Sequence, residues 1–97
     1  MRALLLIAAA APLVALAQDD GAARSLAATC ANCHGTDGRS ATQEVMPLAG
    51  LPKSFLVDQM KAFKEGKRPA TIMHQLAKGY TDQQIELIAD YLAAQKK

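Results

Sequence analysis

An all-α fold is predicted for residues 18–97, and three observations lead to it. Two segments, 54–64 and 81–94, place apolar side chains at helical spacing. The second segment begins with a capping box, which marks the start of a helix. Residues 18–97 contain no strand-like alternation, internal repeat or low-complexity tract. A chain of 97 residues is one domain at most, so these helices share a single core.

The sequence provides few bulky side chains for that core. The chain is 51% hydrophobic, but much of this fraction lies in residues 3–17, and the whole sequence has no tryptophan, two tyrosines and two phenylalanines. Small domains with so little bulk depend on disulfides, a metal or a cofactor. The composition therefore excludes a large multidomain enzyme and predicts a bound prosthetic group.

Residues 1–17 have the pattern of a secretory signal peptide. A positively charged start precedes an apolar run that ends in the small-x-small sequence Ala15-Leu16-Ala17. The alternative is a membrane anchor, but the run is shorter than the ~20 residues that cross a bilayer, and Pro12 interrupts it. We expect cleavage after Ala17, a periplasmic location and no stable membrane insertion.

The first helix is expected over Ala22–Ala31, with Asp19 or Asp20 as its N-cap. Its alanines favour a helix and bring the first cysteine to the helix end. Residues 35–38 have the composition of a turn. Residues 39–52 contain two prolines and lack a clear period, so we expect a loop there.

The next helix is expected from Ser54 to about Lys64, because Leu56, Met60 and Phe63 follow one another at i, i+4 and i+7. Gly66 should end this helix.

A short helix or turn is expected over Pro69–Ala77, ended by Gly79. The last helix is predicted over Asp82–Ala94, after the capping-box sequence of residues 81–84. Its apolar face consists of Ile85, Ile88, Ala89 and Leu92.

The sequence C-x-x-C-H over residues 30–34 carries the chemistry. Cys30 and Cys33 alone are compatible with a disulfide, a thioredoxin-like redox pair or half of a zinc site. The redox pair lacks a surrounding βαβ pattern, and the zinc site lacks a second ligand pair, since His74 is the only other histidine. His34 decides among them, because C-x-x-C-H is the attachment sequence of a c-type haem. We expect both thiols to hold one haem covalently and His34 to bind its iron.

A second axial ligand is expected on the opposite face of the haem. The candidates are Met46, Met60, Met73 and His74. Met46 lies too close to His34 unless the loop is tight, and Met60 belongs to an apolar helix face. Adjacent helical residues point about 100° apart, so only one of Met73 and His74 can face the iron. The residues alone favour Met73 and leave His74 open.

Residues 21–95 resemble the small class I bacterial cytochromes c. The matching motifs are the sequence C-x-x-C-H-G-x-x-G over residues 30–38, Pro-Leu-Ala-Gly over 47–50, Phe63–Arg68, Met73, and the helix over Asp82–Ala94. This resemblance implies helices wrapped around one covalently bound haem, with His34 and Met73 as the axial ligands of the iron. It leaves His74 as an ordinary polar neighbour.

The resemblance implies two further contacts. The Pro47 carbonyl would accept the Nδ1–H of His34 and so direct Nε2 to the iron. A purely conformational role for Pro47 is the alternative. Arg68 would pair with a haem propionate, and a solvated arginine is the alternative.

Two short stretches, 47–52 and 70–80, are more narrowly similar to the cytochrome subunit of flavocytochrome c sulfide dehydrogenase. This similarity implies a subunit that takes electrons from a sulfide-oxidising, flavin-containing partner and passes them to a soluble acceptor. A single C-x-x-C-H excludes a dihaem form. The first alternative is a freely diffusing carrier of a respiratory or photosynthetic chain. The second, an enzyme or gas sensor with an open iron position, conflicts with Met73 as ligand.

Charge is less informative than the motifs. The formal net charge is +2. A basic cluster, defined here as Lys61, Lys64, Lys67 and Arg68, is able to steer an acidic redox partner, but a solvated helix face is the favoured interpretation. Without aromatic stacking residues or a dense basic stripe, the sequence does not indicate nucleic-acid binding.

Overall fold

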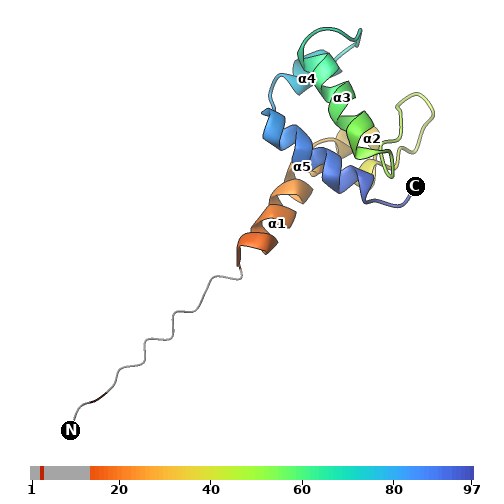
Figure 1. Cartoon of the computed structure of the whole chain (residues 1–97). Coiled ribbons are helices and arrows are strands. Elements are labelled where there is room, and N and C mark those ends of the chain that lie inside the picture. Colours follow the sequence, from red (N-terminus) through yellow and green to blue (C-terminus); the bar gives the residue numbers. More distant parts are fainter. Residues whose placement is uncertain (1–2, 4–13) are drawn as a thin grey trace.

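The computed structural model describes the backbone of residue 3 and residues 14–97, and side chains from residue 21 onward (Figure 1). Most of the expected signal peptide therefore lies outside the described residues. The elements in order are α1 (Val14–Ala28), α2 (Ala31–His34), η1 (Thr36–Gly38), α3 (Lys53–Lys64), α4 (Met73–Ala77) and α5 (Asp82–Ala93). This part of the chain contains no strand, which confirms the all-α prediction.

Helix α1 is longer at its start and shorter at its end than predicted. It begins at Val14, so Asp19 and Asp20 lie inside the helix, and the prediction that they cap it is wrong. Alanines precede them, and the cost of aspartate inside a helix is below ~1 kcal/mol, too little to stop it. The helix ends at Ala28 and is followed by a tighter turn, in which the N–H groups of Thr29 and Cys30 donate to the carbonyls three residues earlier at 3.3 and 3.0 Å. The Thr29 hydroxyl also donates to the Leu26 carbonyl at 2.8 Å.

Helix α3 matches its prediction to within one residue. Leu56 and Phe63 are buried, and Met60 is partly buried against the core. Gly66 ends the helix in a left-handed conformation with φ of 73°. Its N–H donates to the Phe63 carbonyl at 3.1 Å, and the Lys67 N–H donates to the Ala62 carbonyl at 2.9 Å. These two bonds form a Schellman motif, which satisfies carbonyls left free at the helix end.

Only the second half of the expected Pro69–Ala77 segment is helical, since α4 begins at Met73. Helix α5 has the predicted capping box. The Thr81 hydroxyl accepts the Gln84 N–H at 3.1 Å, and the Gln84 side chain accepts the Thr81 N–H at 2.9 Å. All four residues of its predicted apolar face are buried: Ile85, Ile88, Ala89 and Leu92.

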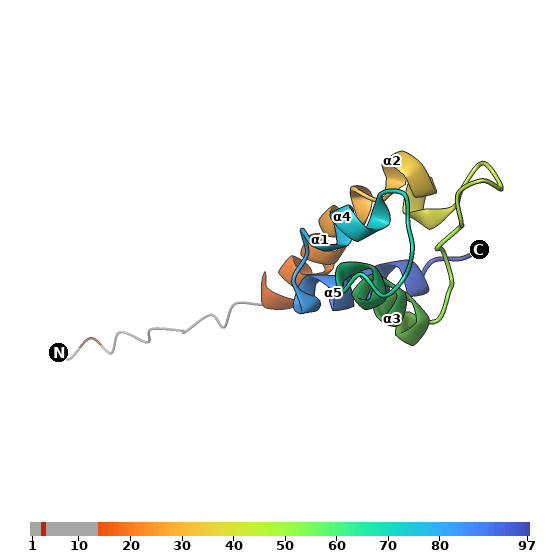
Figure 2. The ribbon, with the colours of Figure 1, turned by 90° about the horizontal axis from the view of Figure 1, so that it is seen from above.

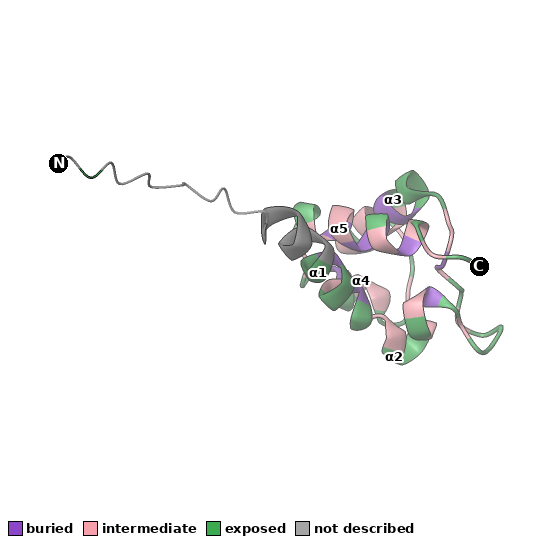
Figure 3. Cartoon of the chain, turned by 90° about the horizontal axis from the view of Figure 1, so that it is seen from below, coloured by how far each residue is buried: buried purple, intermediate pink, exposed green. Residues whose placement is uncertain are grey.

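Helix α5 lies between α1 and α3 and packs against both, while α4 packs on α3 (Figures 1 and 2). The segment 65–72 arches from α3 to α4 (Figure 2). The buried cluster sits where these helices face one another (Figure 3). It consists of Ala27, Leu56, Val57, Ile85, Ile88, Ala89 and Leu92. This core is small and aliphatic, as the composition predicted.

The predicted loop over 39–52 has no helix or strand. It is held at one end by the Gly38 carbonyl, which accepts the N–H groups of Leu48 at 2.8 Å and Ala49 at 3.1 Å. The Gly50 N–H donates to the Leu92 carbonyl of α5 at 2.9 Å. The loop is therefore fixed both to η1 and to the core. No helix in the described part of the chain is long and apolar enough to cross a membrane.

Candidate haem site

Cys30, Cys33 and His34 lie together on one helical turn. The Cys30 carbonyl accepts the N–H of His34 at 2.9 Å and that of Cys33 at 3.3 Å. Both thiols are free. Cys30 is half-buried against the core, and burial raises the pKa of its thiol against the opposing effect of a hydrogen bond with Thr29. Cys33 is exposed. The turn thus presents one inner and one outer thiol beside an imidazole, the donor set for covalent haem attachment.

Two glycines after the histidine shape the backbone of the site. Gly35 has φ of 84°, and a Cβ there would lie 2.0 Å from the Arg39 carbonyl oxygen. Gly38 has φ of 81°, and a Cβ there would lie 2.9 Å from the Ala49 nitrogen and 3.0 Å from Leu92 Cδ2. Both positions therefore require glycine, and Gly38 lets the loop approach closely.

The imidazole of His34 is oriented by a backbone carbonyl. Its Nδ1 lies 2.6 Å from the carbonyl oxygen of Met46. With Nδ1–H as the donor, Nε2 keeps the lone pair that binds iron. This observation fits a haem at the site, because the ring is held in the tautomer that ligation requires.

The acceptor is Met46 and not Pro47, so the prediction for the Pro47 carbonyl is wrong. Successive carbonyls of an extended chain point in opposite directions, so only one of two neighbours can face the ring. Pro47 acts indirectly. It confines the preceding residue to an extended conformation and thereby fixes the Met46 carbonyl.

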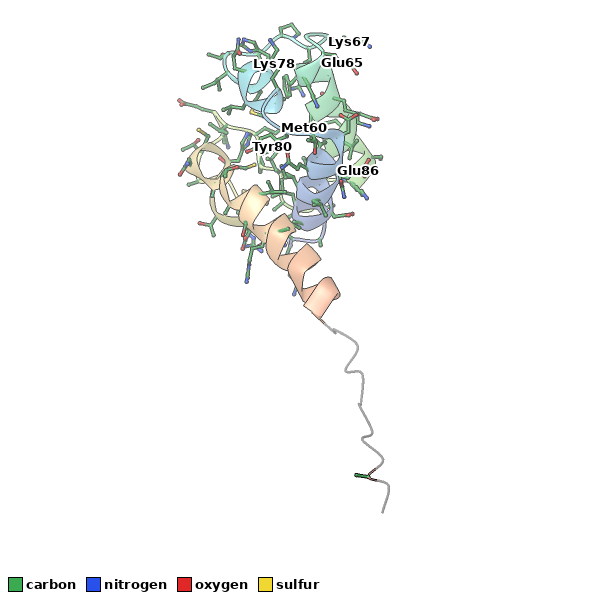
Figure 4. The ribbon with its side chains drawn as sticks, turned by 90° about the vertical axis from the view of Figure 1, so that its left-hand side faces the viewer. Met60, Glu65, Lys67, Lys78, Tyr80 and Glu86 are labelled. Carbon is green, nitrogen blue, oxygen red and sulfur yellow. The ribbon has the colours of Figure 1, made fainter. Side chains whose placement is uncertain are left out.

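The same bond holds the Met46 backbone on the Nδ1 side of the His34 ring, and the Met46 side chain is exposed. This arrangement disfavours Met46 as a second ligand. Met60 is partly buried against the core cluster on α3, as expected for a packing residue (Figure 4). Met73 and His74 remain, and both are half-buried at the start of α4.

The two remaining candidates differ in their support. Histidines that bind metals almost always donate their second ring N–H to an acceptor. The Nδ1 of His74 is buried and has no hydrogen-bond partner among the described residues. His74 thus lacks the hydrogen bond on its second ring nitrogen that His34 has. A methionine ligand needs no such bond, because its thioether has no N–H to satisfy. The chemistry of the donors favours Met73.

A hydrogen bond links the segment after Met73 to the residue before Cys30. The Tyr80 hydroxyl lies 2.7 Å from Thr29 Oγ1, and Tyr80 is partly buried against the core (Figure 4). Because the Thr29 hydroxyl donates to Leu26, Tyr80 acts as the donor to Thr29. On the other side of the motif, the Tyr91 hydroxyl donates to Asp37 at 2.6 Å. Sequence reasoning missed both tyrosines, because neither has a local signature.

Arg68 is held against α3. Its guanidinium donates to Gln59 Oε1 and stacks over the Phe63 ring, 4.6 Å from the centroid. It lines a pocket together with Gly66, Pro69, Ala70 and His74. The expected propionate contact is compatible with this position and stays a prediction.

The basic cluster is partly neutralised. Lys64 donates to the Tyr80 carbonyl at 2.7 Å and lies 3.5 Å from Asp82. Lys67 pairs with Glu65 at 2.8 Å, which raises the pKa of Lys67, and both lie at the end of the molecule away from α1 (Figure 4). The cluster therefore presents less positive charge than its sequence suggests.

Comparison with known proteins agrees with this site. Residues 18–96 match the family model described as "Cytochrome c". The chain belongs to the cytochrome c family. Its cofactor is accordingly one covalently bound haem c, for which the C-x-x-C-H turn supplies both thiols.

Three relatives illustrate the range of the family. The chain is 43% identical over 67 residues to the cytochrome subunit of sulfide dehydrogenase from Chlorobaculum tepidum, covering 68% of this chain and 59% of the relative. It is 40% identical over 80 residues to cytochrome c4 from Pseudomonas aeruginosa, covering 82% and 40%. It is 34% identical over 83 residues to cytochrome c-554(548) from Halomonas halodenitrificans, covering 82% and 100%. The chain thus spans 59% and 40% of the first two relatives, less than two thirds of each.

Proposed function

We propose that this chain is an electron-transfer cytochrome and makes or breaks no substrate bond itself. Cys30 and Cys33 would hold the haem, and His34 and Met73 would be the ligands of its iron. The observation that carries the proposal is the hydrogen bond from His34 Nδ1 to the Met46 carbonyl, which reserves Nε2 for the iron.

When bound, the haem supplies an iron that gains and loses single electrons, and a thioether ligand favours its reduced state. The protein's part would be to supply both protein ligands of the iron. The Met46 carbonyl keeps the His34 ring in one orientation, and Met73 would supply the second ligand. A closed coordination sphere excludes peroxide and gases, which separates a carrier from an enzyme or sensor.

Substitution of the methionines tests the axial ligand. Met73→Ala should abolish the weak far-red band of ferric haem bound by a thioether and should lower the reduction potential, with the haem still attached. Met46→Leu is the matched control, because it removes a thioether but keeps the backbone carbonyl. A band that survives Met73→Ala, or disappears in Met46→Leu, would refute the assignment.

The proposed electron donor is a sulfide-oxidising flavoprotein. Sulfide would lose two electrons to the flavin, which would release them singly to the haem, and the haem would reduce a soluble acceptor. The short stretches 47–52 and 70–80 and the Chlorobaculum relative support this donor. A flavin-containing polypeptide should co-purify with the chain, and sulfide should reduce the haem of the pair. Failure of both results would refute this partner and leave the haem site unaffected.

A freely diffusing carrier is the second candidate. It is favoured by the match to the full length of the Halomonas cytochrome. Size-exclusion chromatography at native concentration distinguishes the candidates. A haem-containing species that elutes alone, without a flavoprotein, supports the carrier.

We further propose that residues 1–17 are removed during export to the periplasm. Helix α1 is continuous across the expected cleavage point between Ala17 and Gln18. Cleavage would therefore shorten α1 at its start and leave the rest of the helix with the haem domain. The intact mass of the purified protein tests this, and a retained Met1 would contradict it.

A further inference from the structure

The two proposed iron ligands lie on separate short helices. His34 is the last residue of α2, and Met73 is the first residue of α4. Helix α4 packs against α3, and neither α1 nor α2 makes a comparable contact with it in the described part of the chain. Because α4 has only five residues, it depends on contacts with its surroundings to form and to keep its place. A ligand on α4 can share an iron with His34 only if α4 is held at the right distance from the C-x-x-C-H turn.

One hydrogen bond connects α4 and its flanking segments with the turn. The Tyr80 hydroxyl donates to Thr29 Oγ1 at 2.7 Å, and Thr29 directly precedes Cys30. Among the described residues, no other hydrogen bond joins residues 65–80 to residues 21–38. The Thr29 hydroxyl donates in turn to the Leu26 carbonyl at 2.8 Å, which fixes its lone pairs toward Tyr80. The bond therefore sets the spacing between the two ligand-bearing parts of the chain.

Tyr80 is itself tied to α4 and α3. Its N–H donates at 3.2 Å to the carbonyl of Ala77, the fully buried last residue of α4. Its carbonyl accepts the ammonium of Lys64, the last residue of α3, at 2.7 Å. Its side chain packs against the core cluster (Figure 4). Tyr80 thus links the ends of α1, α3 and α4, and a displacement of α4 pulls directly on the Tyr80–Thr29 bond.

We propose that Tyr80 is a positioning residue for the second iron ligand: through Thr29 it holds α4, and with it Met73, close to the C-x-x-C-H turn. This inference rests on the proposed function, because it concerns Met73 as a ligand. An external ligand that replaces Met73 needs room beside the iron, so α4 has to move away from the turn and the Tyr80–Thr29 bond has to break. The bond therefore opposes the replacement of Met73.

Tyr91 provides a matched control in the same chain. Its hydroxyl donates to Asp37 at 2.6 Å, so both tyrosines make side-chain hydrogen bonds of similar length across a similar sequence separation. The Tyr91 bond joins α5 to η1 and includes no residue of the segment that carries Met73. Tyr80→Phe and Tyr91→Phe should both lower the free energy of unfolding, but only Tyr80→Phe should ease the replacement of Met73.

Titration of the haem-loaded ferric protein with imidazole, followed by absorbance, measures this replacement. Tyr80→Phe should bind imidazole about fivefold more tightly than wild type, which is the equilibrium effect of losing one net hydrogen bond. Tyr91→Phe should bind imidazole as the wild type does. Equal affinities in wild type and Tyr80→Phe, or equal gains in the two Phe variants, would overturn the proposal.

Variants of Thr29 test whether Tyr80 acts through this residue. Thr29→Ser keeps the hydroxyl and should leave imidazole affinity unchanged, whereas Thr29→Val removes the hydroxyl and should raise it. Adding Tyr80→Phe to Thr29→Val should raise it no further, because the same bond is already lost. A further gain in the double variant would contradict the proposal. A wild type without covalent haem or the far-red thioether band instead refutes the proposed function, and this inference with it, before any imidazole is added.

Discussion

The two histidines of the chain are both half-buried, but they are supported differently. The ring of His34 has a backbone carbonyl at 2.6 Å, whereas the Nδ1 of His74 is buried without a partner in the described part of the molecule. The polypeptide therefore satisfies the Nδ1 nitrogen of His34 itself. The first region holds its histidine ring in one orientation, whereas the second leaves a polar nitrogen without a hydrogen bond.

The largest expected effect comes from preventing covalent attachment of the haem. Cys30→Ala combined with Cys33→Ala should give a chain without covalent haem that is largely unfolded, because the aliphatic core is small. Haem staining after denaturing electrophoresis and circular dichroism measure attachment and folding. A variant with native helix content and a cooperative thermal transition would show that the core is sufficient alone.

A pair of glycines provides a matched comparison of the two regions. Gly35 precedes the turn after His34, and Gly66 lines the pocket of His74. Both have positive φ, but a Cβ on Gly35 would lie 2.0 Å from the Arg39 oxygen, whereas nothing lies within 4 Å of one on Gly66. Gly35→Ala should cost about 3 kcal/mol or more, and Gly66→Ala about 1 kcal/mol. Denaturant unfolding of the holo-protein measures both, and equal costs would contradict the difference in packing.

Pro47→Ala should have a smaller effect, confined to the region of His34. The Met46 carbonyl remains, so the hydrogen bond to His34 should persist, but the backbone that presents it becomes less restricted. The expected loss is about 1 kcal/mol in the free energy of unfolding, without loss of the far-red thioether band. Loss of the band would mean that Pro47 positions more than the Met46 carbonyl.

The smallest effect is expected for Lys53, which makes no hydrogen bond with either histidine. Its ammonium lies 3.0 Å from Asp90 and 3.1 Å from Glu86, and hydrogen bonds to these carboxylates raise its pKa above the ordinary 10.5. A raised pKa stabilises the fold below the unfolded value, and the contribution is lost as pH rises through the folded value. The difference in Tm between wild type and Lys53→Gln should therefore be small and should shrink above about pH 10.5 and with added salt.

Sequence reasoning succeeded where local chemistry decides the structure. The capping box at Thr81 and the helical spacing of Leu56 and Phe63 concern residues within a few positions of one another, and the structure confirms them. The C-x-x-C-H motif likewise lies within five consecutive residues, so its thiols and imidazole could be recognised from the sequence alone. Asp19 and Asp20 misled the prediction because weak capping preferences lose to a long alanine-rich helix.

The remaining features depend on contacts that no local pattern records. A backbone carbonyl has the same chemistry at every residue, so the choice of Met46 over Pro47 depends on how the loop is anchored at Gly38. The pairing of Arg68 with Gln59 depends on how the chain turns after Gly66. The absence of a hydrogen-bond partner for the buried Nδ1 of His74 among the described residues can be recognised only once its surroundings are known.

The two tyrosine hydrogen bonds have a consequence for the order of folding. Tyr80 to Thr29 spans 51 residues and Tyr91 to Asp37 spans 54, so each bond closes a large loop that begins close to the C-x-x-C-H turn. Loop-closure entropy must be overcome before such contacts stabilise the fold, which slows their formation. We therefore expect both bonds to form late in folding, after the transition state. Tyr80→Phe and Tyr91→Phe would then accelerate unfolding more than they retard refolding.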